Sequence, residues 1–225
     1  MVRRPSTNGG DRGERGEMLI YAVADIHGRR ERLARIAAVV GRHRPDVIVA
    51  AGDLEGELDH REVLGALTEG GIPVFVVPGN IDGPGLAAAL DDFEGVVDLH
   101  LRTHRFRDVP FAGFGAAPFF SRAPGRRGDA AALADLVEEG GVFVTHVPPR
   151  GVLDRGFAGL RGGMRTLHEI VTTRRPAVHV FGHIHEGRGT AWIGDTLAVN
   201  CSLGHSGNGC LIHFDGRGAA EATLL

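Results

Sequence analysis

This chain of 225 residues has no lysine, two cysteines, one tryptophan and one tyrosine. Two cysteines are too few for the disulfide framework of a small secreted domain, and Cys201 and Cys210 lack the C-x-x-C spacing of zinc and redox sites. We expect two reduced thiols, with a bridge between them as the open alternative. Because lysine is absent, the 25 positive side chains other than histidine are all arginine. We attribute this to coding bias and not to chemistry.

The chain also lacks long apolar runs and a large net charge. No apolar stretch is long enough to span a bilayer, and the first 17 residues lack the apolar core of a signal peptide. We therefore expect a cytoplasmic protein. A net charge of −3 and a pI near 6.5 give no indication of nucleic-acid or membrane binding.

The chain has enough apolar residues to form one hydrophobic core. The chain is 43% hydrophobic, and its length favours one domain, which we place at residues 18–225. Residues 1–17 are rich in Gly, Arg and Glu with almost no apolar content, so they cannot offset their ordering entropy. We expect a disordered tail there.

The first half of the chain predicts repeated strand, turn and helix units. Buried apolar runs end just before Asp25, Asp53 and Asn80, whose numbers differ by 28 and 27, about the length of a βαβ unit. Parallel strands joined by right-handed crossovers place their carboxyl ends at one sheet edge. We therefore expect these three side chains to meet.

The second half predicts shorter strands, with helices around 129–139 and 164–173 and two hairpins ending the chain. Strand-rich segments that follow βαβ units suggest an α/β fold, in which two mixed sheets pack face to face with helices outside.

Polar residues recur just after the apolar strands. In "ADIHG" and "GHIH" the pairs Asp25 with His27 and His183 with His185 are two apart, so each pair can face one side of an extended chain. Singly, an aspartate here is most often a helix N-cap, an asparagine holds a turn, and a histidine such as His146 is more often partly buried and satisfied. Jointly, these groups would be a costly desolvated cluster unless a cation satisfied them. The full set is Asp25, His27, Asp53, Asn80, His146, His183 and His185.

Seven mixed nitrogen and oxygen donors exceed the four ligands of a structural zinc, so the pattern favours two metal ions. Two divalent ions and two aspartates leave a positive site that attracts an anion such as phosphate. Paired metals can clamp a phosphoryl group and activate water, which indicates phosphoester hydrolysis.

The ordered motifs D-x-H, G-D, G-N-x-D, H and G-H-x-H resemble the calcineurin-like metallophosphoesterase superfamily, from about Met18 to the C-terminus. The resemblance implies a four-layer α/β/β/α sandwich and in-line attack by a metal-bridging hydroxide. It assigns Asp25, His27 and His185 to a first metal, Asn80, His146 and His183 to a second, and Asp53 as the bridge. It favours Mn²⁺, with Fe, Zn²⁺, Co²⁺ or Ni²⁺ as alternatives, and His179 is then structural.

Two segments, "THVPPRGVLD" and "HVFGHIHEGRGT", are also similar to small bacterial phosphodiesterases and to the metallophosphoesterase-domain branch of animals. One departure stands out. Many members have histidine in the third motif, where this chain has Ile81, which cannot donate a proton to the leaving group. We therefore expect steep dependence of rate on leaving-group pKa, and leave open which group replaces the histidine.

By resemblance the catalytic set is Asp53, Asn80, Asp82 and His146, and Asn80 contacts the substrate. Arg150, after "HVPP", is a second candidate for substrate contact, with a surface arginine as the alternative. Further candidates near the substrate are Phe119, Phe120, Arg122 and His205, the last as a replacement acid. We favour a phosphodiesterase acting on a small phosphoester or nucleotide. A phosphomonoesterase or nucleotidase, a metal- and nucleotide-binding regulator and a non-catalytic scaffold are the alternatives, and oligomeric state stays open.

Overall fold

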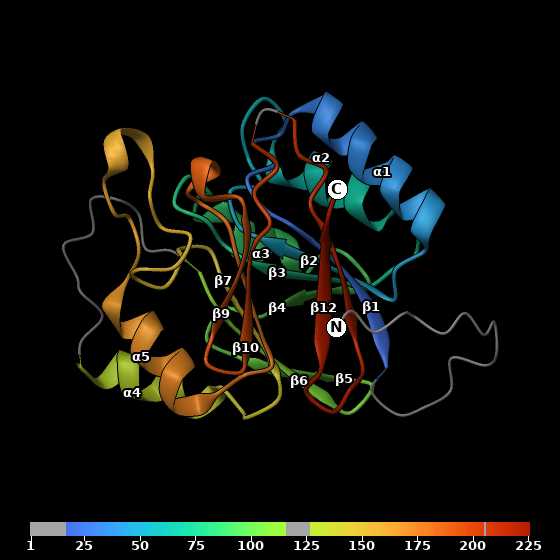
Figure 1. Ribbon diagram of the computed structural model, residues 1–225. Coiled ribbons are helices and arrows are strands. Elements are labelled where there is room, and N and C mark those ends of the chain that lie inside the picture. Colours follow the sequence, from blue (N-terminus) through green and yellow to red (C-terminus); the bar gives the residue numbers. More distant parts are fainter. Residues whose placement is uncertain (1–16, 116–126, 205) are drawn as a thin grey trace.

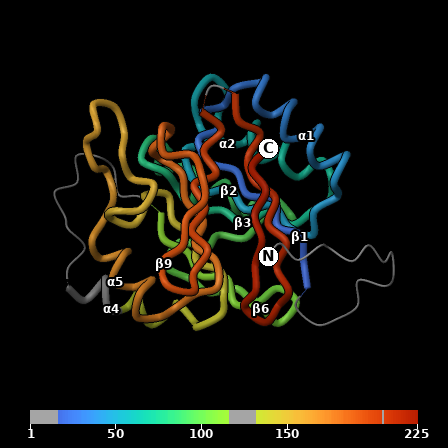
Figure 2. The backbone as a smooth tube through the Cα atoms, viewed as in Figure 1, coloured from blue at the N-terminus to red at the C-terminus, as the bar shows by residue number. Residues whose placement is uncertain are grey.

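The computed structural model describes residues 17–115, 127–204 and 206–225, which form two six-stranded sheets with helices outside them (Figures 1 and 2). Both sheets contain parallel and antiparallel pairs, so the predicted α/β architecture of two mixed sheets is confirmed. The predicted disordered tail lies outside the described residues apart from Glu17, and so do Phe119, Phe120, Arg122 and His205.

The first sheet has the order β12-β11-β1-β2-β3-β4. Strands β1 to β4 are parallel, whereas β11 and β12 run antiparallel to their neighbours. β1 is buried along its whole length because both faces of the sheet are covered, which explains its continuous apolar sequence. The strands are β1 (Met18–Val23), β2 (Val47–Ala51), β3 (Val74–Val77), β4 (Val96–Asp98), β11 (Cys210–Phe214) and β12 (Ala220–Leu224).

The second sheet has the order β5-β6-β7-β8-β10-β9, with parallel pairing from β6 through β10. Its two edge strands, β5 and β9, run antiparallel to their neighbours. The hairpins β9–β10 and β11–β12 end the chain as predicted. The strands are β5 (Thr103–Phe106), β6 (Val109–Phe114), β7 (Val142–Thr145), β8 (Val178–Phe181), β9 (Gly189–Ile193) and β10 (Thr196–Asn200).

Helices cover the outer faces of both sheets. Over the first sheet lie α1 (Arg30–His43), α2 (His60–Thr68) and α3 (Gly85–Leu90), and over the second lie α4 (Arg127–Leu136) and α5 (Arg165–Arg174). α2 begins with a capping box in which Asp59 and Glu62 bond each other's backbone N–H groups. None of the helices in the described ranges combines the length and apolarity of a membrane span.

The main core lies between the two sheets. It joins residues such as Ile20, Val49 and Val77 from the first sheet to Phe111 and Val180 from the second. Cys201 and Cys210 are buried in this core as free thiols, as expected. Because this core fixes the two sheets against each other, strand ends from both sheets meet at one edge of the sandwich.

Candidate metal centre

The candidate ligands follow the carboxyl ends of strands in both sheets. Asp25, Asp53 and Asn80 follow the adjacent strands β1, β2 and β3, and His146 and His183 follow the adjacent strands β7 and β8. Contacts across the two sheets bring them together: the His183 N–H donates to both Asp25 oxygens at 3.2 and 3.1 Å. The candidate ligands therefore lie together at the carboxyl ends of the strands, as predicted.

Several of these ligands have a strained backbone. Asp25, His27, Asp53 and His183 have φ of 59°, 53°, 55° and 68°, a left-handed region that costs L-residues about 1–3 kcal/mol each and is least unfavourable for Asn, Asp and His. Backbone bonds between neighbouring loops hold this geometry, with Asp25 N–H donating to Gly52 O at 3.0 Å and His27 N–H to Asp53 O at 2.9 Å. The conformations turn the side chains from successive strand ends toward one space.

A first group comprises Asp25, His27 and His185, whose ligand atoms lie within 4.8 Å of one another. His185 Nε2 is 3.6 Å from Asp25 Oδ1, and His27 Nε2 is 3.5 Å from His185 Nε2. This is the set that the resemblance assigned to a first metal.

A second group surrounds His146. Its Nδ1 lies 2.9 Å from the Ala51 carbonyl, and its Nε2 lies 2.9 Å from Asn80 Oδ1 and 3.5 Å from Asp53 Oδ1. The His183 ring lies edge-on to that of His146, with centroids 5.0 Å apart. By distance, Asp25 is also within reach of Asp53 and His146, so it belongs to both groups. The bridging role that the resemblance assigns to Asp53 stays a prediction.

The hydrogen bonding of His146 tests whether these residues suit a metal. The Ala51 carbonyl can only accept, so Nδ1 donates to it, and Nε2 is the ring nitrogen left to bind a metal. Nε2 faces Asn80 Oδ1 and Asp53 Oδ1, two oxygens that can also bind a cation. A cation between these atoms would satisfy all of them, so the donor set fits a metal that takes nitrogen and oxygen ligands.

The pKa values of two candidate histidines agree with metal binding, which requires neutral imidazole. Burial lowers the pKa of His27 and lowers that of His183 to about 4. Hydrogen bonding to Asp25 raises the pKa of His185 in spite of burial. At neutral pH, His27 and His183 therefore present lone pairs without losing a proton first.

The pKa values of Asp25 and Asp53 shift in opposite directions. Burial raises the pKa of Asp25, but its hydrogen bond to His185 and the nearby His146 outweigh burial, and the net pKa is lowered. Burial raises the pKa of Asp53 to about 6, with Asp25 adding to the rise and His146 opposing it. Without a cation, Asp53 thus carries the less stable of the two negative charges.

Asp82 serves the loop around the ligands. Its Oδ2 accepts from the N–H groups of Asp53 at 2.9 Å and Gly79 at 2.6 Å, and its Oδ1 accepts from Leu54 at 2.8 Å and Glu55 at 3.0 Å. Because both oxygens bond backbone donors, Asp82 positions the Asp53 loop against the Asn80 loop. Sequence reasoning placed Asp82 among the catalytic residues and missed this role, although a carboxylate next to a turn glycine is a known signal for loop bonding.

Arg32, in the first turn of α1, also holds this region and was not predicted. It is only 6% exposed, and its guanidinium donates to the carbonyls of Asp25 at 2.5 Å, Ile26 at 3.4 Å and Gly204 at 2.6 Å. It therefore ties the β1–α1 loop to the β10–β11 loop. No local sequence motif marks a buried arginine of this kind, since its partners are distant in the chain.

Other predicted residues lie apart from the ligands. His179 is buried in β8, where it stacks on Phe143 and bonds Thr145 Oγ1 at 2.9 Å, which agrees with a structural role. The Arg150 side chain is exposed, and the backbone N–H of Arg150 donates to Met164 O at 2.9 Å. Its predicted contact with substrate stays a prediction.

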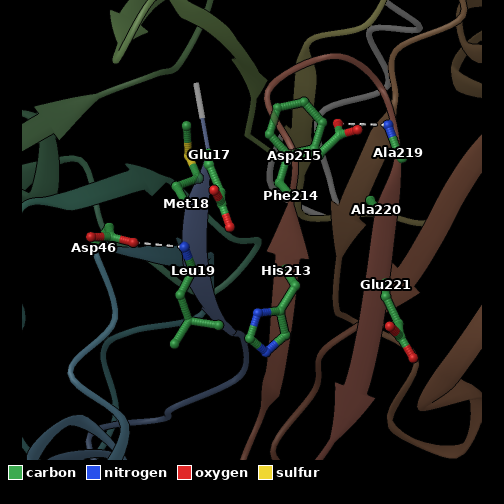
Figure 3. A pocket seen from close by; sticks show the side chains of 10 residues that line it. All are labelled: Glu17, Met18, Leu19, Asp46, His213, Phe214, Asp215, Ala219, Ala220 and Glu221. Atoms are coloured by element: carbon green, nitrogen blue, oxygen red, sulfur yellow. Dashed lines mark hydrogen bonds between the residues drawn. The ribbon is translucent and has the colours of Figure 1, made fainter. Parts of the chain in front are cut away.

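A large cavity of about 520 Å³ lies at the opposite edge of the first sheet (Figure 3). It is bounded by the start of β1 and the end of β11, with the acidic side chains of Asp46 and Asp215 at its rim. Asp46 accepts from Leu19 N–H at 2.7 Å and Asp215 from Ala219 N–H at 2.9 Å. These carboxylates serve local backbone, and the cavity does not adjoin the candidate ligands.

Comparison with known proteins completes the description. The family model of the calcineurin-like phosphoesterases matches residues 18–187. A UPF0046 protein of Caenorhabditis elegans is 30% identical over 86% of this chain and 64% of its own length. Human metallophosphoesterase domain-containing protein 1 is 39% identical over 31% of this chain and 22% of its own length. The chain thus spans less than two thirds of these relatives.

Solved structures show the same fold. A protein from Thermus thermophilus has a TM-score of 0.68 at 17% identity, covering 92% of this chain and 99% of its own. A structure described as a novel archaeal phosphodiesterase has a TM-score of 0.57 at 15% identity, covering 92% of this chain and 100% of its own.

Proposed function

This chain belongs to the calcineurin-like phosphoesterase family, and from that membership we propose that it is a metal-dependent phosphoric ester hydrolase that prefers phosphodiesters. The observation that carries the proposal is the meeting of possible ligand atoms from His146, Asn80 and Asp53 at the strand ends. Burying these polar atoms together costs free energy unless a cation binds to them, and bound cations attract phosphate.

In this proposal Asp25, His27 and His185 hold one divalent ion, and Asn80, His146 and His183 hold a second, with Asp53 between them. Two such ions supply a clamp for the phosphoryl group, an activated water and charge stabilisation for the leaving oxygen. We favour Mn²⁺ from the family resemblance. The carboxylate ligands suit it, whereas the imidazole ligands suit Fe, Zn²⁺ and Ni²⁺.

The chain's own residues prepare this site. Arg32 and Asp82 hold the loops, so the ligands are oriented before substrate arrives, and little reorganisation is needed during reaction. The His146 Nδ1–H bond to Ala51 O keeps Nε2 free to bind metal.

The preference for diesters rests on Ile81. Its side chain is 46% exposed beside the ligands, and its N–H donates to Asp53 Oδ1 at 3.0 Å. An isoleucine here gives the leaving oxygen no proton, so good leaving groups are favoured over poor ones. The archaeal phosphodiesterase of the same fold is consistent with this preference.

The test is hydrolysis by protein stripped with EDTA and then given Mn²⁺. We expect cleavage of bis-p-nitrophenyl phosphate that exceeds cleavage of p-nitrophenyl phosphate and disappears in Asp53→Asn. The matched control is Asp195→Asn, an exposed aspartate in the β9–β10 turn, which should keep full activity.

The outcomes separate the alternatives. Faster cleavage of the monoester would favour a phosphomonoesterase. No cleavage of either ester, with Mn²⁺ binding shown by calorimetry, would overturn the enzyme proposal in favour of a binding or scaffold role.

A further inference from the structure

Residues 149–165 form a projecting segment, which we call the arm; it follows His146 and ends at the first residue of α5. Its two sides are joined by hydrogen bonds from Gly162 N–H to Asp154 O and from Gly156 N–H to Leu160 O, both at 2.9 Å. Figure 1 shows the arm, in gold, extending from the body of the molecule, and Figure 2 shows the same path. The arm presents its tip, around the 3₁₀ turn Phe157–Gly159, to solvent.

The tip exposes two large apolar side chains. Phe157 is 86% exposed and Leu160 is 74% exposed, more than any other large hydrophobic residue in the described ranges. Apolar side chains scattered over a surface need no explanation, but two at the end of one projection form a binding element.

Arginines lie along the arm. Arg155 is beside the tip, and Arg150 and Arg165 are at the base, where Pro149 pairs with Met164. Arg150, Arg155 and Arg165 are exposed, and no ion pair among the described residues involves them. Arg161 is paired with the buried carboxylate of Asp154 at 2.8 Å. Four arginines against one aspartate give the arm a charge of +3, whereas the whole chain carries −3. Glu186 lies near Gly156 and reduces the local excess by one without removing it.

The base of the arm packs on the loop that carries two candidate ligands. A Cβ atom placed on Gly162 would lie 2.7 Å from Ile184 Cδ1, and one placed on Gly187 would lie 2.1 Å from Leu153 O. Ile184 separates His183 from His185 in the sequence. The apolar tip is therefore attached to the same edge of the sandwich as the candidate metal centre.

We propose that the arm docks this protein on the surface of a bilayer that contains anionic phospholipid. Phe157 and Leu160 enter the interfacial region, while Arg155 beside the tip binds headgroup phosphates and the other arginines of the arm add electrostatic attraction. An apolar insertion together with a basic cluster supplies the two signals that stable peripheral binding needs. Docking holds the edge with the metal centre near the lipid.

The exposed area favours lipid over a second copy of the chain. A large aromatic side chain offers about 150–250 Å², whereas a stable protein interface buries about 800 Å² on each partner. A leucine and a phenylalanine on a narrow projection fall well short of that area, but they suffice for insertion when basic side chains add electrostatic attraction. Docking goes beyond the proposed hydrolysis and does not depend on it, since it is measured without turnover.

The experiment uses the full chain and sedimentation with phosphatidylcholine vesicles, with and without phosphatidylglycerol. We expect binding only to the vesicles with phosphatidylglycerol, weakening as salt rises. The double substitution Phe157→Glu with Leu160→Glu should lower the apparent affinity by about tenfold or more. The control Trp192→Glu changes a 61% exposed aromatic on β9, away from the arm, and should bind as the unaltered chain does.

A second readout places the tip directly. Trp192 is the sole tryptophan, so Phe157→Trp in a Trp192→Phe background reports only on the arm, and its emission should shift to the blue when anionic vesicles are added. The circular dichroism of each variant checks that the fold is retained.

Three results would overturn the proposal: equal binding to both kinds of vesicle, binding of a single-stranded oligonucleotide in place of vesicles, or a dimer in sedimentation equilibrium that the double substitution dissociates. An unshifted emission from the Phe157→Trp protein with vesicles bound would likewise exclude the arm as the contact.

Discussion

Residues at the candidate metal centre divide into ligands and the groups that hold them. The sequence predicted the candidate ligands, since each follows an apolar strand and carries a donor that metals accept. It did not identify Arg32, because a buried guanidinium bonded to loop carbonyls has no local motif. The partners of Arg32 include Gly204, which lies 172 positions away.

Ile81 leads to a prediction about leaving groups. Substituting histidine restores a proton donor beside Asp53, and we expect Ile81→His to raise the rate on alkyl diesters by about tenfold or more. Rates on activated aryl diesters should change less, so the dependence on leaving-group pKa becomes flatter. Initial rates across a series of esters measure this slope. Ile81→Gln, polar but unable to protonate the leaving group, is the matched control, and an equal gain in that variant would refute the acid role.

His179 leads to a prediction about pH. Burial lowers the pKa of His179 to about 3, against about 6.5 in the unfolded chain. Between these values the unfolded state binds a proton that the folded state does not, so stability is lost as pH falls from about 6.5 toward 3. This single group should remove about 1.4 kcal/mol per pH unit within that window.

Urea unfolding of the metal-free protein at pH 7, 6 and 5 measures this loss. In the same series on His179→Gln, which cannot titrate, the free energy of unfolding should fall less steeply with pH, by about 1.4 kcal/mol per pH unit. Identical slopes for the two proteins would show that His179 is not buried as described. Other histidines contribute equally to both series, so the difference isolates His179.

Elements were predicted well where strands are long and apolar, and less well where they are short. The parallel strands β1, β2 and β3 and the closing hairpins follow from continuous apolar runs and turn residues. The short helix α3 and the edge strand β5 have weak patterns, since β5 alternates between exposed and half-buried residues. Such elements exist because neighbouring strands and helices bury one of their faces.

The link that Arg32 makes between α1 and two loops can be tested. Arg32→Met leaves the carbonyls of Asp25 and Gly204 without their charged donor, and we expect a loss of about 2 kcal/mol in the free energy of unfolding. Because the loop at Asp25 carries ligands, affinity for Mn²⁺ should fall about tenfold. Chemical denaturation and calorimetry measure the two effects separately.

Arg30→Met on the same helix is the control. Arg30 is exposed and faces Glu62 at 3.8 Å, so its loss should change stability by no more than about 0.5 kcal/mol. If Arg32→Met lowered stability but left Mn²⁺ affinity unchanged, Arg32 would be a structural residue without a positioning role.

At the scale of the whole molecule, metal binding should be linked to folding. The ligands come from both sheets, so the unfolded chain cannot present them together, and Mn²⁺ at about 100 times its Kd should stabilise the protein by about 2.7 kcal/mol. For a chain of this length we expect Tm to rise by about 5–10 °C.

Thermal unfolding with Mn²⁺ and with EDTA checks this expectation. His185→Ala should lose most of the rise, whereas His213→Ala, an exposed histidine on β11, should keep it. A Tm that does not respond to Mn²⁺ in the unaltered protein would contradict the proposed metal centre.

The sequence by itself determined the class of fold, the order of the main elements and the donor residues, because strand patterns and strand-end motifs are local. Tertiary structure alone decided how far the ligands approach one another, that Asp25 is within reach of both groups, and that Arg32 and Asp82 hold their loops. It also decided that the arm stands out from the body with Phe157 and Leu160 at its tip. Whole-chain charge and composition average over that arm, and exposure depends on what packs around a residue, which no local pattern contains.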